Sequence, residues 1–275
     1  MGLTIFGGKG FVGSHYVDAY YDSAIGNIVS INARDDYEVH SKDVLYLIST
    51  VHSHSVPKDP QVYIDTNLTT LITVLENWRK REDSKDGVFN FISSWFVYGK
   101  VNNAKECDQC SPSGFYPITK RCAEQLLESY CKAYGLKYRI LRLANVIGSG
   151  DKKVSPEKNA LQHILNKIKN NEDVELHGGG RFFRDYMHVT DCVRAIELVI
   201  AKGQTNTIYN VGNGPTWSFR DIVLYIKNYV QSTSKITDTD TSVYDFQMNT
   251  EKLKALGYVP TLQGWKLYDY LARNG

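Results

Sequence analysis

The residues best suited to chemistry are Tyr116 and Lys120, which stand four positions apart in the run Tyr-Pro-Ile-Thr-Lys. On a helix, residues i and i+4 share one face, so the phenol and the ammonium would point the same way. A nearby cation is expected to lower a phenol's pKa from about 10 towards working pH, which suits a general acid or base. Ser94 ends an apolar run and could hydrogen-bond the same substrate oxygen. We therefore expect Ser94, Tyr116 and Lys120 to be catalytic, moving a proton to or from a secondary alcohol.

A glycine-rich turn near the N-terminus predicts a partner for this chemistry. Gly7, Gly10 and Gly13 lie between the strand-like run Leu3–Phe6 and a helical pattern. The first glycine permits a tight turn, the second lets a pyrophosphate approach the backbone, and the third lets helix and strand pack closely. The helix N-terminus adds free N–H groups and partial positive charge. A plain strand-to-helix turn is the alternative, but the context favours a nicotinamide dinucleotide contacted by Gly7, Gly10, Phe11, Val12 and Gly13.

The end of the second strand bears on the choice between NAD and NADP. An acid is usual there, because it binds the ribose 2′-hydroxyl of NAD. Here Asn32 is neutral and would not repel a 2′-phosphate, while Arg34 could bind one. Alternatively, Arg34 is merely exposed and Asp35 or Asp36 takes the ribose. The pattern leans towards NADP and leaves NAD open.

Short apolar runs and helical patterns alternate along the first part of the chain. The expected strands are Leu3–Phe6, Ile28–Ile31, Val44–Ser49, Val88–Ser94 and Tyr138–Leu143. The expected helices are Phe11–Tyr21, Thr66–Trp78 and Ile118–Tyr134. This order predicts an α/β fold with a doubly wound, Rossmann-like parallel sheet, and an NAD(P)-binding domain over residues 1–150. Ser94 would then lie at the carboxyl end of a strand, where ligands bind in such sheets.

The second part of the chain, residues 151–275, is less regular. It predicts a small lobe that mainly binds the substrate, with segments at about 181–211 returning to the sheet domain. Helices are expected over Asn159–Lys169, Asp191–Ala201, Phe219–Val230 (capped by Ser218) and Thr250–Leu256, and strands over Val174–His177 and Thr207–Val211. The segment Ser232–Thr241 is expected to be a polar loop.

Composition excludes several classes of function. The net charge of +2 over 275 residues gives no reason to expect nucleic acid. No apolar run approaches the roughly 20 residues of a membrane span, and the chain starts directly on a strand-like run, so we expect a cytoplasmic protein without a membrane segment. Cys107 and Cys110 have CxxC spacing but lack a second pair or a nearby His, which favours free thiols and no metal site.

Several longer runs resemble the extended short-chain dehydrogenases/reductases, in particular the nucleotide-sugar epimerases, dehydratases and reductases. The resemblance covers nearly the whole chain and rests on motifs that occur in the family's order. They are GGKGFVGSH at 7–15, the Asp59-Pro60 to Asn67 segment, SSWFVYG at 93–99, YPITK at 116–120, LRLANVIG at 141–148, RDYMHVTD at 184–191, YNVGNG at 209–214 and LGYVP at 256–260.

The resemblance implies a nucleotide-sugar substrate and assigns further residues to it. Asn145 would contact the phosphate and Arg184 the pyrophosphate of such a substrate. Trp95 and Phe96 stand where the family's 4,6-dehydratases carry Asp-Glu, so dehydration is disfavoured. These two aromatic residues could wall a sugar or nicotinamide pocket, with simple core packing an equal alternative. We also expect Ser49, Asn67 and Lys120 to contact the cofactor.

With the resemblance taken into account, three functions remain open. The first is an NAD(P)-dependent nucleotide-sugar epimerase that works through a 4-keto intermediate. The second is an NADPH-dependent reductase of nucleotide 4-keto sugars, which would use the same residues. The third is a non-catalytic NAD(P)-binding sensor, against which the retained Tyr116 and Lys120 argue. The resemblance also implies a homodimer that pairs the helices expected over Thr66–Trp78 and Ile118–Tyr134.

Two departures from the family pattern carry predictions. Only about a dozen residues separate the second strand from Val44–Ser49, so we expect the sheet to lack one edge strand–helix unit, or to keep only a stub such as Tyr37–Val39. Members of the family often have an arginine in this segment that contacts the nucleotide, but no arginine occurs between Arg220 and Arg273. We therefore expect the contacts to the base to differ from the family's. Asp238 and Asp240 are expected to form a solvated acidic turn.

Overall fold

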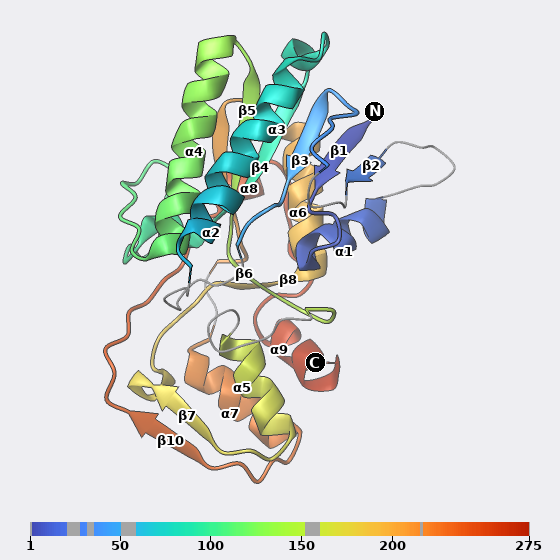
Figure 1. Ribbon diagram of the computed structural model, residues 1–275. Coiled ribbons are helices and arrows are strands. Elements are labelled where there is room, and N and C mark those ends of the chain that lie inside the picture. Colours follow the sequence, from blue (N-terminus) through green and yellow to red (C-terminus); the bar gives the residue numbers. More distant parts are fainter. Residues whose placement is uncertain are drawn as a thin grey trace.

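The computed structural model describes residues 2–20, 28–31, 36–50, 59–151, 160–214 and 217–274. Its centre is a parallel six-stranded sheet in the order β2-β1-β3-β4-β5-β9 (Figure 1). The strands are β1 (Leu3–Phe6), β2 (Ile28–Ile31), β3 (Asp43–Tyr46), β4 (Val88–Ser94), β5 (Lys137–Leu143) and β9 (Thr207–Val211). The predicted Rossmann-like parallel sheet is confirmed.

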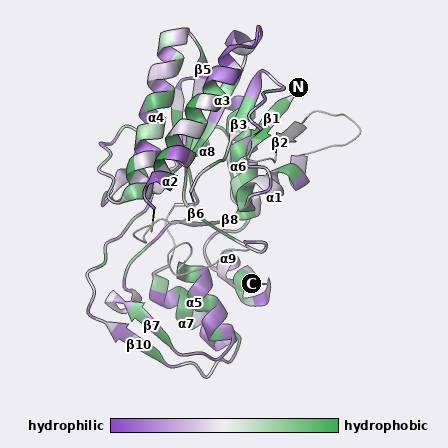
Figure 2. Ribbon diagram, viewed as in Figure 1, coloured by the Kyte–Doolittle hydropathy of each residue, from purple (hydrophilic) through white to green (hydrophobic). Residues whose placement is uncertain are grey.

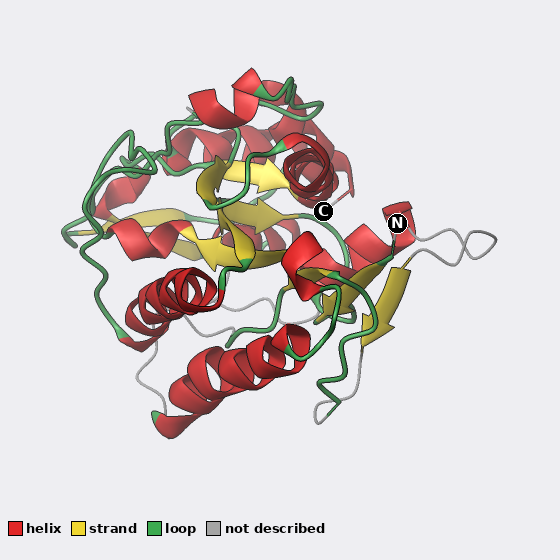
Figure 3. Cartoon of the chain, turned by 90° about the horizontal axis from the view of Figure 1, so that it is seen from above, coloured by secondary structure: helices red, strands yellow, loops and turns green. Residues whose placement is uncertain are grey.

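Helices cover both faces of this sheet, as the view in Figure 3 shows. One face carries α1 (Phe11–Tyr20) and α6 (Val189–Lys202), which pack on Leu45 and its neighbours. The other carries α3 (Thr70–Arg79) and α4 (Phe115–Tyr134), which pack on Tyr46. Adjacent strand residues thus enter opposite cores, as expected for strands buried on both sides. In Figure 2 the strands are mostly green while the outer faces of the helices carry purple.

A smaller unit lies below the carboxyl edge of the sheet (Figure 1). Its own apolar core is formed by α5 (Ala160–Lys169), α7 (Phe219–Tyr229) and α9 (Trp265–Asn274), with the parallel pair β7 (Val174–His177) and β10 (Ile236–Thr239) beside them. A second short pair, β6 (Asn145–Ile147) and β8 (Tyr186–His188), runs between the two units. The remaining short elements are α2 (Gln61–Ile64), α8 (Glu251–Ala255), a π-helical turn at Asp65–Thr69, and 3-10 turns at Ser84–Asp86, Trp95–Tyr98 and Gly178–Gly180.

Some expectations need correction. The expected polar loop Ser232–Thr241 contains β10, and α9 was not expected at all. Asp238 is paired with Arg220 at 2.6 Å, so it is more than a solvated turn residue. Within the described residues the sheet ends at β2, and the possible stub Tyr37–Val39 is not a strand. No helix in the described part is both long and apolar enough to cross a bilayer.

Candidate active site

The glycine turn between β1 and α1 has the close packing that its spacing predicts. Gly7 adopts φ +87°, and its carbonyl accepts a hydrogen bond from the Gly10 N–H at 3.0 Å. A Cβ on Gly13 would lie 2.3 Å from the Gly7 carbonyl oxygen. The backbone therefore turns tightly at the carboxyl edge of the sheet and directs the N-terminus of α1 towards it. These residues fit the pyrophosphate of a dinucleotide, which such a turn binds through free N–H groups.

Replacing Gly13 by alanine tests this packing. The added methyl group would meet backbone atoms of the turn, which can relieve the contact only by moving. We expect the variant to bind nicotinamide nucleotides at least about 10-fold more weakly, and to lose stability of about 1–3 kcal/mol. Fluorescence titration with NADH and NADPH, together with urea unfolding, measures both.

Gly135→Ala is the matched control for Gly13→Ala. Gly135 has φ +66° but a Cβ there would have no neighbour within 4 Å, so only backbone strain of roughly 1 kcal/mol is expected. Its nucleotide affinity should stay unchanged. Equal nucleotide affinity in Gly13→Ala and the wild type would show that the turn does not hold the cofactor.

The structure brings Ser94 and Tyr116 together. Ser94 is the last residue of β4, and its hydroxyl accepts a hydrogen bond from the Phe96 N–H at 3.4 Å, which caps the following 3-10 turn. Tyr116 lies in the first turn of α4, close to the side chains of Ser94 and Ser49. Ser49 follows β3, the strand next to β4 in the sheet. Two hydroxyls from neighbouring strand ends therefore meet the phenol.

Asn67 holds Ser49 in this position. It lies in the π-helical turn, a local distortion that is common at functional sites. Its side-chain oxygen accepts hydrogen bonds from the Ser49 hydroxyl at 3.2 Å and the Thr50 N–H at 3.1 Å. Its amide nitrogen donates to the hydroxyls of Thr50 at 3.1 Å and Thr119 at 2.9 Å. The amide is thus saturated by the protein, and it links β3 to α4 beside Tyr116.

The electrostatics around Tyr116 differ from the expectation. Burial raises the pKa of Tyr116, and the nearby Ser94 and Ser49 side chains act in the opposite direction without cancelling it. Lys120 is not among the groups that shift this pKa. Its ammonium donates to the Ile92 carbonyl at 2.6 Å and lies over the Phe91 ring at 4.2 Å. The prediction that Lys120 lowers the phenol's pKa is therefore wrong for the protein alone, and Tyr116 carries its proton at neutral pH.

Lys120 is itself strongly perturbed. Its side chain is only 2% exposed, and burial lowers its pKa to about 7, with Glu124 acting in the opposite sense. Glu124, one turn further along α4, is held by Arg142 through two hydrogen bonds of 2.9 and 2.8 Å and by Arg121 at 2.8 Å. A buried amine that titrates near neutral pH is typical of functional sites.

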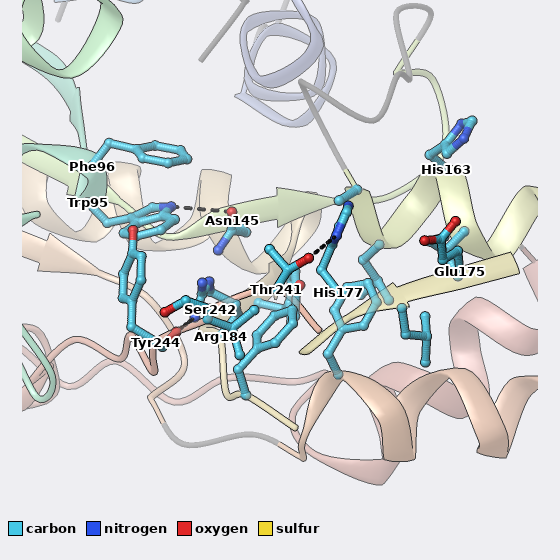
Figure 4. A pocket seen from close by; sticks show the side chains of 18 of the residues that line it. Trp95, Phe96, Asn145, His163, Glu175, His177, Arg184, Thr241, Ser242 and Tyr244 are labelled. Atoms are coloured by element: carbon cyan, nitrogen blue, oxygen red, sulfur yellow. Dashed lines mark hydrogen bonds between the residues drawn. The ribbon is translucent and has the colours of Figure 1, made fainter. Parts of the chain in front are cut away.

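A cavity of about 650 Å³ opens next to this cluster, between the sheet and the smaller unit. Its end nearest Tyr116 is aromatic: Trp95 stacks between Phe96 and Phe246 with ring centroids at 4.0 and 4.1 Å. Phe96 meets the Tyr116 ring edge-on at 6.1 Å. Trp95 also donates from its indole nitrogen to the Asn145 side-chain oxygen at 3.3 Å, as Figure 4 shows.

Arg184 brings positive charge into the same cavity. Its guanidinium donates to the backbone carbonyls of Phe183 at 2.9 Å and of Tyr244. It also lies 4.6 Å from the Phe182 ring and 4.8 Å from the Tyr244 ring. Burial lowers its pKa, but a guanidinium remains charged at any physiological pH. The four residues expected to bind substrate, Trp95, Phe96, Asn145 and Arg184, therefore line one cavity.

Other expected site residues are not in this cluster. Asn32 and Arg34 fall outside the described residues, so the lean towards NADP stays a prediction. The far end of the cavity is lined by residues that the sequence did not single out, namely His163, Lys167, Glu175, His177, Thr241 and Ser242. They belong to no motif. Thr241 follows β10, which was not predicted because its sequence is polar. Among the described residues no group of three or more His, Cys, Asp or Glu could hold a metal.

Comparison with known proteins fits this geometry. Residues 3–212 match the model of the NAD-dependent epimerase/dehydratase family. A putative UDP-glucose 4-epimerase of Methanocaldococcus jannaschii is 26% identical, over 94% of this chain and 93% of the relative. The dTDP-glucose 4,6-dehydratase 1 of Escherichia coli is 25% identical, over 94% and 88%.

Among solved structures, the UDP-glucose 4-epimerase of Thermotoga maritima superimposes with a TM-score of 0.83 at 24% identity, covering 99% of each chain. The UDP-glucuronic acid 4-epimerase of Bacillus cereus reaches 0.84 at 21% identity, covering 100% of this chain and 95% of the other. At these identities the structures establish a shared fold. With the family model spanning most of the sequence, this chain belongs to the NAD-dependent epimerase/dehydratase family.

Proposed function

We propose that this protein is an NAD(P)-dependent nucleotide-sugar epimerase that works through a 4-keto intermediate. The observation that carries the proposal is the meeting of Tyr116, Ser94 and Ser49 next to Phe96, which lines a cavity together with Arg184. A phenol and hydroxyls beside a cationic pocket suit a sugar attached to a diphosphate. Related 4-epimerases have structures with UDP-glucose and with NAD, which supports the same ligand classes here.

Each residue has a defined task in this reaction. Tyr116 is protonated in the protein alone, and the positive charge of a bound oxidised nicotinamide would favour its phenolate. As the phenolate, Tyr116 takes the proton of the sugar's C4 hydroxyl and later returns it, while Ser94 hydrogen-bonds the same oxygen. A nicotinamide cofactor, held by the turn at Gly7–Gly13 and by Lys120, would accept a hydride from that carbon and give it back. Arg184 and Asn145 hold the diphosphate while the keto sugar rotates to present its other face between the two hydride transfers.

The aromatic pair at the reactive end argues against loss of water. Trp95 and Phe96 have no group that can protonate a departing hydroxyl, yet dehydratases occur among the relatives. A reductase of 4-keto sugars would use the same Ser94, Tyr116 and Lys120. The product and the fate of the cofactor therefore separate these reactions.

The test is an incubation with UDP-glucose, UDP-glucuronic acid or UDP-N-acetylglucosamine and a trace of NAD or NADP, followed by proton NMR of the products. We expect interconversion of C4 epimers of at least one of them without net change in reduced nicotinamide. Stoichiometric consumption of NADPH with a 4-keto sugar would favour the reductase, and a 4-keto-6-deoxy product the dehydratase. Failure of the protein to bind any nicotinamide nucleotide would reject all three reactions.

A further inference from the structure

Trp95 joins the aromatic end of the cavity to the residues expected to hold the diphosphate. Its side chain is buried, yet its indole is hydrogen-bonded to Asn145 and faces the guanidinium of Arg184. We infer that Trp95 is a positioning residue, which orients the Asn145 amide so that an N–H faces the diphosphate of the substrate. This inference rests on the proposed function, because it assumes a ligand that contains a diphosphate.

The orientation of the Asn145 amide follows from two partners that each have a single hydrogen-bonding role. The indole N–H of Trp95 can only donate, so the group 3.3 Å from it is the side-chain oxygen of Asn145. The carbonyl of Asp185 can only accept, so the group 3.0 Å from it is the amide nitrogen. Both partners therefore require the same orientation. Figure 4 shows it, with the oxygen of Asn145 towards Trp95 and the nitrogen on the other side.

This orientation gives the cavity a hydrogen-bond donor. Within the described residues, the two bonds use the amide oxygen and one of the two amide N–H groups, and the second N–H is left for a ligand. Asn145 lines the same cavity as Arg184. An N–H and a guanidinium suit the oxygens of a diphosphate, whereas an amide oxygen in the same place would repel them.

The backbone of Asn145 is fixed independently of Trp95. Asn145 is the first residue of β6, pairs with Tyr186 of β8, and donates its backbone N–H to the Asp185 carbonyl at 3.1 Å. Strand pairing does not fix the rotation of the amide about its last side-chain bond, which has a broad range in asparagine. The indole and the Asp185 carbonyl hold the two ends of the amide, so loss of the indole removes one of these two constraints.

Trp95 is itself held firmly enough for this task. Its ring packs against Phe96 and Phe246, with centroids at 4.0 and 4.1 Å. Phe246 is fully buried and forms a backbone bridge with Arg184. The guanidinium of Arg184 lies 5.9 Å from the centre of the indole, within the range of a cation–π contact. Trp95 therefore contacts both of the cavity residues that are expected to hold the diphosphate.

Isothermal titration of the wild type with UDP, dTDP, CDP and GDP identifies the preferred nucleoside diphosphate, and inorganic pyrophosphate serves as the ligand without a base. Trp95→Phe keeps an aromatic ring but removes the indole N–H. We expect it to weaken both ligands about 5-fold, as for loss of one neutral hydrogen bond. Trp217→Phe is the matched control, because its indole contacts Tyr225 and Tyr268 in the smaller unit. It should change both affinities by less than about 2-fold.

A double-mutant cycle with Asn145→Ala separates positioning from packing. We expect Asn145→Ala to weaken pyrophosphate about 10-fold, and the variant with both substitutions to match Asn145→Ala within about 2-fold, because the effect of Trp95 passes through Asn145. Independent losses that multiply to about 50-fold would overturn the inference. Unchanged affinity of Trp95→Phe for pyrophosphate would overturn it as well.

Asn145→Asp tests the same point with Trp95 in place, and it stays informative if Trp95→Phe does not fold. The carboxylate keeps an acceptor for the indole but puts a negative charge where the amide N–H faces the ligand. We expect Asn145→Asp to bind pyrophosphate at least about 3-fold more weakly than Asn145→Ala. Equal or tighter binding would contradict the inference. A wild-type protein that binds neither a nucleoside diphosphate nor pyrophosphate would reject the proposed function itself.

Discussion

Replacing Tyr116 by phenylalanine is expected to lower kcat about 10²–10⁴-fold, the usual contribution of a positioned acid or base. The ring would keep its edge-on contact with Phe96 at 6.1 Å, so the binding of nucleoside diphosphates should change by less than about 2-fold. Initial rates of C4 epimer formation and isothermal titration with the preferred nucleoside diphosphate separate the two effects.

Tyr134→Phe provides the control for this variant. Tyr134 ends the same helix but is 45% exposed and away from the hydroxyl cluster, so its kcat should match the wild type. Near-normal epimerase activity in Tyr116→Phe would remove the phenol from the reaction. Retained biological function of a Tyr116→Phe protein that forms no epimer would instead favour the non-catalytic NAD(P)-binding sensor.

The sheet and the cluster of Ser94 and Tyr116 could be predicted because their signals are local. β4 and β7 have the predicted bounds. β4 is a mostly apolar, buried run, and β7 alternates buried apolar with exposed polar residues, and each ends at a clear change in pattern. β10 was missed because its Ile-Thr-Asp-Thr run is polar and pairs only with β7 at the edge of a two-stranded sheet. A strand with so little apolar surface gives no alternating pattern to find.

Contacts between distant segments explain the other gaps. The helical spacing of Tyr116 and Lys120 correctly places both on one face of α4. The direction of the ammonium, however, is decided by the Ile92 carbonyl of β4, which helix geometry does not reveal. The position of Ser49 beside Tyr116 likewise depends on Asn67, which crosses between β3 and α4. The expected homodimer stays a prediction.

The buried ammonium of Lys120 lowers the stability of the folded protein, so its removal should raise the free energy of unfolding. The unfolded chain holds this proton up to about pH 10.5, whereas the folded protein releases it at about pH 7. Between these pH values the unfolded state binds more protons, so stability rises with pH; below about pH 7 the full penalty of a buried charge applies. Lys120→Met is therefore expected to abolish epimerase activity and to raise the free energy of unfolding.

The gain should be largest at or below neutral pH. Each pKa unit corresponds to about 1.4 kcal/mol, so complete relief would approach about 5 kcal/mol. Loss of the hydrogen bond to Ile92 offsets part of this, and we expect a net gain of about 2 kcal/mol at pH 6.5 that shrinks by pH 9. Urea unfolding of the nucleotide-free protein at both pH values measures it.

The matched control is Lys132→Met, which removes an exposed lysine from the last turn of the same helix. It should change the free energy of unfolding by less than about 0.5 kcal/mol at either pH. Two results would contradict the prediction: a lower free energy of unfolding in Lys120→Met than in the wild type at pH 6.5, or an equal gain in stability of these two proteins between pH 6.5 and 9. Either would show that the buried ammonium does not destabilise the folded state. The stabilised but inactive variant would instead show that the chain retains Lys120 for its reaction at the expense of its fold.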